Sequence, residues 1–264
     1  NPTLVGFFYW RLLMQRDELI KRLNTLFQAD KFKDYCPNGL QIEGTSEINK
    51  IVCGVSISQE LIDHAIAQNA DAIIVHHGIF WNKDQYQIVG VKYQRIAKLI
   101  KNNINLIAYH LPLDCHAELG NNAQLARVLG LNVHGQAFDT QYQLDIIWYG
   151  ELTKVLSGSE FAEHYTRETG HQPLLLGNPQ KQIKKIAWCT GGANSLFDEA
   201  INLGVDCFIS GEVSEPMKSI AEENDVLYLA GGHYVTERYG IMALANYLSS
   251  IGYNAEFIEL YNPV

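Results

Sequence analysis

Two adjacent histidines close an apolar run in the segment DAIIVHHGIFW. Imidazole is a good metal ligand and a poor core side chain, so His76 and His77 indicate metal chemistry. Further along the chain, His233 and Glu237 stand four residues apart after two glycines, and Asp114 ends the motif LPLD. A lone histidine at a strand end is more often a hydrogen-bonded structural residue. Five candidates in matching places favour a metal site instead.

The candidate ligands can meet only if the backbone presents them correctly. Consecutive side chains of a strand point to opposite faces, so we expect the strand to end at Val75 and the chain to turn at Gly78. His233 and Glu237 are expected on the first turn of a helix, where residues i and i+4 share a face. Asp114 is a hard oxygen ligand that could bridge two ions.

The donor set contains several imidazoles, two carboxylates and no thiolate. It suits zinc, manganese, iron, cobalt or nickel and does not choose among them. Five or six donors exceed the need of one tetrahedral ion, so two divalent ions about 3.5–4 Å apart are expected per subunit. His110 is interpreted as a further ligand or a neighbour of the ligands, and His116 as a less favoured candidate. The remaining histidines are interpreted as solvated surface residues: His64, His134, His164 and His171.

Short apolar runs alternate with helical periodicities along the chain, which predicts βαβ units and a largely parallel α/β sheet. In such sheets functional groups collect beyond the carboxyl ends of the strands, so the candidate ligands should share one rim. The middle of the chain adds an aromatic strand, DIIWYG, and a helix from about Ser159 to Thr169. The other predicted strands cover residues 51–55, 72–75, 105–109, 186–190, 206–209, 226–230 and 256–259.

The pattern occurs twice. Residues 51–77 align with residues 186–212 at a constant shift of 135 and without a gap. This register favours two similar α/β halves, although any two βαβ units look somewhat alike. The predicted units are residues 14–130, with the His-His pair and Asp114, and residues 131–264, with an inserted segment and the second half. Residues 1–13 are interpreted as an upstream extension or cloning remnant, because a helical pattern begins cleanly after Met14.

The motif CTGGANS, residues 189–195, is open to two interpretations. Its two glycines lie between a strand and a helix start, where backbone N–H groups could hold a phosphate. A tight turn capped by Asn194 or Ser195 explains the same residues equally well. No P-loop motif is present, and no nucleophile elbow surrounds Ser210 or Ser214.

Charge and cysteine content narrow the function classes. The 20 basic and 29 acidic residues give a net charge of -9, which disfavours binding to nucleic acid or to an anionic membrane. The five cysteines are widely spaced, form no CxxC pair and are odd in number. They predict reduced thiols and a cytoplasmic location. No apolar run approaches the length of a membrane span.

These residues lie in motifs that together resemble the Nif-three-like family, often labelled GTP cyclohydrolase 1 type 2 homologues. The motifs are YCPNGLQIEG, ADAIIVHHGIFW, YHLPLDCHAELGNNAQLA, SGEVSE and AGGHYVTERYG. The resemblance implies a two-domain α/β subunit with a dinuclear metal centre, usually assembled into a toroidal homohexamer. The metal ligands that it implies are His76, His77, Asp114, His233 and Glu237. It also marks His110 and Glu212 as candidate catalytic neighbours, and Gly78 departs from the proline that many members have there.

The resemblance implies a metal-dependent hydrolase that acts on a nucleotide or a related small molecule, with GTP cyclohydrolase chemistry as the named possibility. His110 or Glu212 could relay protons in that reaction. A phosphatase or phosphodiesterase with the same centre is the alternative among enzymes. An assembly or partner-docking protein that binds metal without turnover is the alternative of another class.

Overall fold

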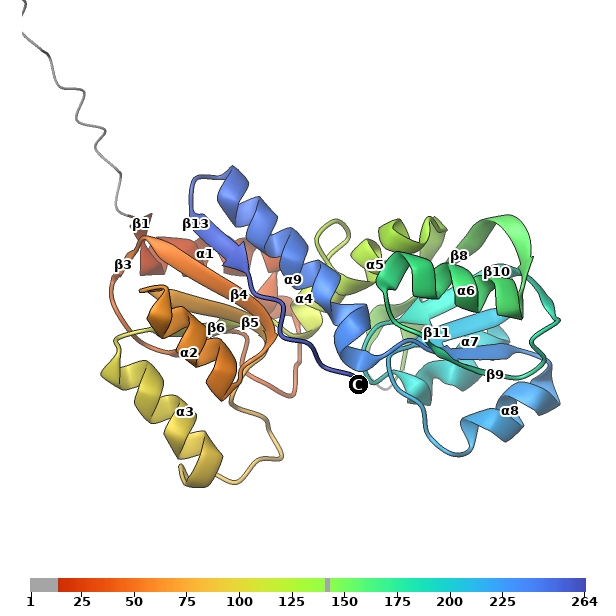
Figure 1. Ribbon diagram of the computed structural model, residues 1–264, viewed down its shortest axis with the longest axis horizontal. Coiled ribbons are helices and arrows are strands. Elements are labelled where there is room, and N and C mark those ends of the chain that lie inside the picture. The colour runs from red at the N-terminus through yellow and green to blue at the C-terminus, as the bar shows by residue number, and fades with distance from the viewer. Residues whose placement is uncertain (1–13, 141–142) are drawn as a thin grey trace, which may run out of the picture.

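The computed structural model describes residues 14–140 and 143–264, which form two large β-sheets covered by helices and one small two-stranded sheet (Figure 1). The prediction for residues 1–13 lies outside the described residues. Small elements accompany the sheets: strands β1 (Met14–Gln15) and β3 (Glu47–Ile48), and the 3-10 turns η1 (Ala29–Lys31) and η2 (Asn194–Leu196). The α/β class predicted from the sequence is confirmed.

The first sheet has the strand order β13-β4-β5-β6-β2, and only β2 runs antiparallel to its neighbour. Its strands are β2 (Gly39–Ile42), β4 (Lys50–Ser56), β5 (Ala72–His77), β6 (Asn105–Ala108) and β13 (Asn254–Phe257). Alternate residues of β4 enter different cores: Ile51 and Cys53 belong to the core that contains residues of α1 and α9 (His233–Ser250), whereas Val52 belongs to the core with α2 and α3. The helices are α1 (Arg16–Phe27), α2 (Gln59–Ala67) and α3 (Gly90–Lys101).

The second sheet has the order β7-β8-β10-β11-β12-β9, with β10, β11 and β12 parallel. Helices α5 and α6 cover one face, and α7 and α8 cover the other. Ser157 begins α6 with a capping box, because its hydroxyl and the Glu160 carboxylate satisfy each other's backbone N–H groups. The strands are β7 (Asn132–Asp139), β8 (Leu144–Ser157), β9 (Leu174–Leu176), β10 (Gln182–Cys189), β11 (Cys207–Ser210) and β12 (Leu227–Ala230). The helices are α5 (Asn121–Leu129), α6 (Gly158–Thr169), α7 (Phe197–Asn202) and α8 (Met217–Asn224).

The same shift of 135 residues relates the strand registers of the two sheets. Ile51 pairs with Ala72 in the first sheet, and Ile186 pairs with Cys207 in the second. The Asp71 carboxylate accepts hydrogen bonds from the N–H groups of residues 49 and 50, and the Asp206 carboxylate accepts them from residues 184 and 185. Both aspartates therefore hold two backbone N–H groups of the neighbouring segment in the same way.

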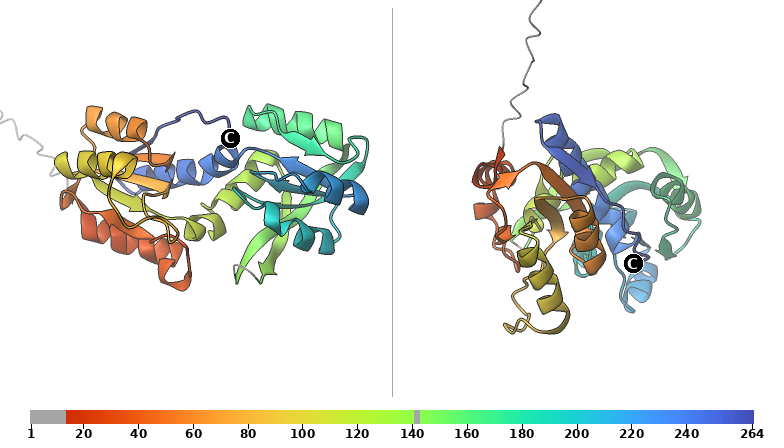
Figure 2. Two further views of the ribbon diagram at one scale, coloured as in Figure 1. Left: turned by 90° about the horizontal axis from the view of Figure 1, so that it is seen from below. Right: turned by 60° about the vertical axis from the view of Figure 1, so that its left-hand side comes forward.

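Elements from both sides of the division predicted at residues 130 and 131 pack into each of the two cores, and the division itself stays a prediction. Helix α9 (His233–Ser250) and β13 pack into the first sheet, where β13 pairs with β4. Helix α5, from the earlier part of the chain, packs onto the second sheet beside α6. Helices α5 and α9 also contact each other between the sheets (Figures 1 and 2). Each sheet thus needs an element from the other part of the chain.

Strand boundaries differ most in the middle of the chain. The sequence predicted the strand DIIWYG, whereas β8 spans 14 residues and forms a hairpin with β7. Both strands carry many exposed residues, and the hairpin contains register shifts, so the apolar pattern there is weak. Among the described residues, no helix combines the length and apolar character needed to cross a membrane.

Replacing Leu244 by alanine tests how firmly α9 joins the first core. Leu244 is fully buried in the core of the first sheet, so its truncation should lower the free energy of unfolding by about 2–5 kcal/mol. Asn246→Ala, on the exposed side of the same helix, should change it by about 0.5 kcal/mol or less. Urea unfolding followed by circular dichroism measures both values. Equal effects of the two substitutions would contradict this packing.

Candidate metal centre

The candidate ligands come together where the carboxyl ends of the parallel strands meet between the two sheets. His76 and His77 end β5, and His110 precedes the short helix α4 (Leu111–Cys115), which carries Asp114. His233 and Glu237 lie on the first turn of α9 as expected, with their Nε2 and Oε2 atoms 3.1 Å apart.

Strand β5 does not end at Val75, so that prediction was wrong. Its pairing with β6 stops at Val75, but its pairing with β4 continues to His77, which lies opposite Ser56. Both imidazoles still reach the carboxylate of Glu237: Nε2 of His76 lies 3.4 Å from Oε1, and Nε2 of His77 lies 3.3 Å from Oε2. The two rings converge because Glu237 presents one oxygen to each.

Gly78 leaves space for the side chain of Gln41. A Cβ atom at this position would lie 2.1 Å from Oε1 of Gln41. That same oxygen accepts a hydrogen bond of 2.9 Å from the N–H of Ile79. The side chain of Gln41 thus fixes the chain directly after the paired histidines.

Every candidate histidine is held through its Nδ1 atom. His76 Nδ1 donates to the carbonyl oxygen of Tyr109 at 2.9 Å, and His77 Nδ1 lies 2.9 Å from the hydroxyl of Ser56. The other two contacts are His110 Nδ1 with Asp34 at 2.9 Å and His233 Nδ1 with Glu212 at 2.7 Å. Carbonyl and carboxylate partners place the proton on Nδ1, which leaves Nε2 free to act as a ligand.

Glu237 is the centre of the donor set. Its carboxylate is buried, and it belongs both to the donor group with His77 and His233 and to the group with His76 and Asp114. Glu237 Oε2 and His233 Nε2 are buried and make no hydrogen bond of acceptable geometry, although they lie 3.1 Å apart. Unpartnered buried polar atoms are rare in folded proteins, so this pair fits a cation that both atoms would bind.

Asp114 occupies one side of the donor set. Its Oδ1 atom lies 3.6 Å from Nε2 of His76 and accepts hydrogen bonds from Asn121 at 2.8 Å and from Thr190 at 3.3 Å. It belongs to one donor group that includes Glu237, whereas Glu237 belongs to two. Glu237 is therefore the carboxylate that the two groups share.

Protons balance the buried charge of this centre in the metal-free protein. Burial alone would lower the pKa of His76, but Asp114 and Glu237 outweigh it and raise the pKa to about 9. For His233, burial is likewise outweighed by Glu237 and then Glu212, and the pKa rises to about 10. Burial lowers the pKa of His77 to about 3, so this ring is neutral. A divalent cation would replace the protons on His76 and His233.

The sequence did not reveal two of the residues that organise the site. Asp34 accepts from His110 Nδ1 and also from the N–H of Leu111 at 3.0 Å. Burial opposes the charge of Asp34, yet the contact with His110 and the further hydrogen bonds keep the pKa of this carboxyl below its usual value. Asn121 is fully buried between Asp114 and His76. Asn121 lies in one of the family motifs and Asp34 directly precedes another. Their roles nevertheless depend on residues far away in the chain.

Other polar residues differ in part from the predictions. His116 stays outside the donor groups of the described residues, and its Nδ1 accepts from the N–H groups of Glu118 and Leu119. His164 is not simply solvated, because its Nε2 bonds the carbonyl oxygen of Leu129. In the motif CTGGANS, the N–H of Gly191 donates to Thr236 at 3.0 Å, which favours the tight turn over a phosphate site. The predicted cap is absent, because neither η2 nor α7 has a side-chain cap.

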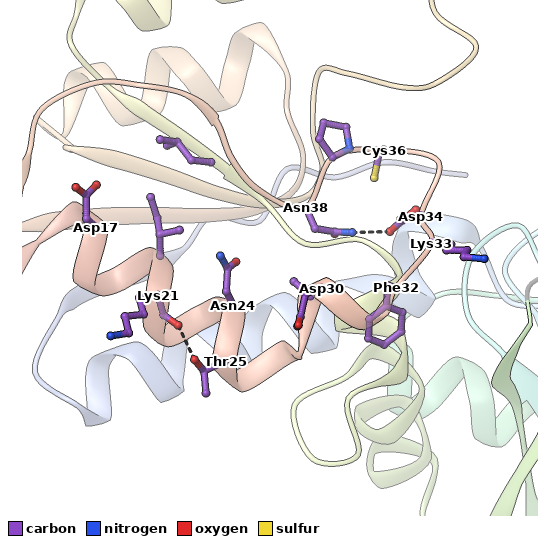
Figure 3. A pocket seen from close by; sticks show the side chains of 14 residues that line it. Asp17, Lys21, Asn24, Thr25, Asp30, Phe32, Lys33, Asp34, Cys36 and Asn38 are labelled. Carbon is purple, nitrogen blue, oxygen red and sulfur yellow. Dashed lines mark hydrogen bonds between the residues drawn. The ribbon is translucent and has the colours of Figure 1, made fainter.

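Two cavities adjoin the donor set. The smaller cavity has a volume of about 100 Å³ and is lined by several candidate ligands, among them His110, Asp114, His233 and Glu237. The larger, of about 1130 Å³, is a groove along α1 and the loop before β2 (Figure 3). Asp34, which lines this groove and accepts from Asn38 (Figure 3), also contacts Nδ1 of His110.

Comparison with known proteins gives the same assignment along the whole chain. The family model described as Duf34/NIF3 (NGG1p interacting factor 3) matches residues 14–263. The chain belongs to this family. Two relatives named GTP cyclohydrolase 1 type 2 homolog are 44% and 45% identical, over 246 and 252 residues. The Pseudomonas aeruginosa protein is covered to 97% by 93% of this chain, and the Haemophilus influenzae protein to 100% by 95% of it.

Solved structures of NIF3 relatives share the fold. A structure of protein ybgI, described as being of unknown function, has a TM-score of 0.90 and 43% sequence identity, and the match covers 95% of this chain and 100% of the other. A Thermus thermophilus protein has a TM-score of 0.82 at 30% identity and is covered to 99% by 95% of this chain.

The metal-free protein should lose stability as the pH rises from about 6.5 to 10. The raised pKa values of His76 and His233 mean that their contribution is complete below the ordinary value of 6.5 and disappears through about 9 and 10. Urea midpoints of chelator-treated protein at pH 6.5 and pH 10 measure this loss. His233→Gln should show a smaller loss, since one of the two groups is removed. An identical loss in the variant would show that other groups cause it.

Gly191→Ala should remove metal binding from the NIF3 protein. Gly191 has a φ of 70°, and a Cβ atom there would lie 2.1 Å from Oε1 of Glu237. Gly130→Ala is the matched control, because its φ is 65° and nothing lies within 4 Å of the added Cβ. It should cost about 1–2 kcal/mol of stability and leave the metal content unchanged. Retained metal in Gly191→Ala, measured by elemental analysis, would contradict the position of Glu237.

Proposed function

We propose that this NIF3 protein is a dinuclear metal-dependent hydrolase that acts on a nucleotide or a related small molecule. The observation that carries the proposal is the common arrangement of the four histidines, each held at Nδ1 with Nε2 left for the centre. Histidines that bind metal in proteins are typically fixed by such an outer contact. The names of the relatives add GTP cyclohydrolase chemistry as the specific candidate.

Two donor groups that share Glu237 would hold the ions. One consists of His76, Asp114 and Glu237, and the other of His77, His233 and Glu237. His110 lies near both, since its nitrogen groups with those of His76 and His77. The donor types fit zinc, manganese, iron, cobalt or nickel. When bound, such ions activate water and stabilise the negative charge that develops during hydrolysis.

The chain's own residues would position and exchange protons around that centre. Asp34 holds Nδ1 of the His110 ring, and the backbone N–H of His110 donates to the side chain of Asn38. The ring is thereby fixed with Nε2 as the atom available for a proton. Glu212, predicted as a second proton relay, instead contacts Nδ1 of His233 while remaining half-exposed at the opening. This contact supports a role in orienting His233.

The size of the inner cavity restricts how a substrate can bind. Ligand pockets usually have about 300–1,000 Å³, whereas the cavity at the donor set has about 100 Å³. It can take the reacting group but not a whole nucleotide. The remainder of the substrate would therefore lie at the opening, next to His77 and His233. The toroidal homohexamer stays a prediction, and such an assembly could enclose this opening.

Metal reloading followed by a nucleotide screen tests the function. Protein reloaded with manganese, zinc or iron should change the purine absorbance of GTP if it opens the ring. Release of inorganic phosphate with unchanged absorbance would favour the phosphatase alternative. Full metal occupancy without turnover of any nucleotide would overturn the hydrolase proposal and favour a metal-binding assembly protein.

Substitutions of the carboxylates should separate the two ion positions. Glu237→Gln should lose both ions and all turnover, because Glu237 belongs to both donor groups, whereas Asp114→Asn should chiefly lose one. Glu212→Gln should weaken metal affinity by about 10–100-fold through the orientation of His233. Glu223→Gln, an exposed carboxylate on α8, should keep the wild-type content. Calorimetric metal titration gives the stoichiometry, and unchanged binding by Glu237→Gln would refute this arrangement.

A further inference from the structure

Two aromatic side chains lie at the opening of the metal centre and have no part in holding the ions. Tyr35 lines the inner cavity and is 43% exposed, and Trp81 is half-buried. Both rings contact His110 edge to face, with centroid distances of 4.9 Å for Tyr35 and 5.2 Å for Trp81. Trp81 also lies 5.8 Å from the ring of His77. The pair therefore borders the candidate ligands directly.

The two rings form one surface because their loops are joined. The N–H of Asn82, next to Trp81, donates to the carbonyl oxygen of Tyr35 at 2.8 Å. The ring centroids are 6.0 Å apart and the planes are inclined by 33°, so the two rings have similar orientations. This backbone contact fixes the pair before any ligand arrives, which reduces the entropy cost of binding.

We propose that Tyr35 and Trp81 form an aromatic platform that stacks against the planar heterocyclic ring of the substrate at the opening of the metal centre. The inference rests on the proposed function, because it names the part of a nucleotide-like substrate that the inner cavity of about 100 Å³ leaves outside. Stacking on aromatic side chains is the usual way to bind a nucleic-acid base without distinguishing which base it is.

The spacing of the rings decides between a platform and a clamp. A ring inserted between two aromatic side chains needs two contact distances, or about 7–8 Å between their centroids. The observed 6.0 Å is too short for insertion. A heterocycle would therefore lie on the accessible side of the pair, with its attached group directed toward the inner cavity.

Titrations with ring-bearing and ring-free probes test the platform. The four common nucleoside monophosphates and ribose 5-phosphate would be titrated into metal-loaded protein by calorimetry and by tryptophan fluorescence. At least one nucleotide should bind better than ribose 5-phosphate and quench the fluorescence. Trp81→Leu should weaken that nucleotide by about tenfold, with binding of ribose 5-phosphate and metal content unchanged. Trp81→Phe should restore most of the affinity but not the quenching.

Tyr35→Leu and Tyr93→Leu form the matched pair of tyrosine substitutions. Tyr93 is 58% exposed on α3, and among the described residues its ring makes no aromatic contact with a candidate ligand. Its loss should therefore leave nucleotide binding unchanged. Tyr35→Leu should weaken the binding of the nucleotide but not the binding of ribose 5-phosphate. If no nucleotide is preferred over ribose 5-phosphate, or if Trp81→Leu weakens both equally, the platform is refuted. If the protein hydrolyses a nucleotide and Trp81→Leu binds it as well as the wild type does, only the platform is refuted. If nucleotide binding depends on Trp81 but no nucleotide is turned over, only the hydrolase proposal is refuted.

Discussion

The buried carboxylate of Glu237 is the group on which the rest of the site depends. Three imidazole nitrogens lie within 3.4 Å of its oxygens, and no lysine or arginine pairs with it among the described residues. A buried carboxylate needs compensating positive charge, which protons on His76 and His233 supply in the metal-free protein. The same constraint makes the site receptive to a divalent cation and explains why Gly191 must lack a side chain.

The exchange of elements between the two sheets provides that constraint. Helix α9 carries His233 and Glu237 on its first turn and then continues into the core of the first sheet. Helix α9 thereby fixes His233 and Glu237 relative to the first sheet, whose strand β5 carries His76 and His77. Helix α5 does the same from the other direction, since Asn121 at its start contacts Asp114 while its apolar side packs onto the second sheet. The position of the site is therefore fixed by packing that stabilises both sheets.

The outer contacts of the four histidines are chemically graded. A backbone carbonyl holds the fully buried His76, a hydroxyl holds His77, and carboxylates hold His110 and His233. Charged partners thus accompany the two histidines that come from loops or helix starts, and neutral partners accompany those on the strand. Carboxylate partners increase the basicity of an imidazole and its affinity for a cation. Together with the platform of Tyr35 and Trp81, this grading gives the centre a rigid inner side and a chemically distinct opening.

The sequence by itself determined the α/β class, the matching register of two βαβ units and the residue types of a metal site. These features follow from local periodicity and from imidazoles and carboxylates at strand ends, which a single chain displays directly. Only the tertiary structure decided that Glu237 rather than Asp114 is central, that β5 continues through His77, and that Asp34 orients His110. Each of these depends on atoms tens or hundreds of residues apart in the chain. Their proximity results from how the two sheets pack against α5 and α9, and no local pattern encodes it.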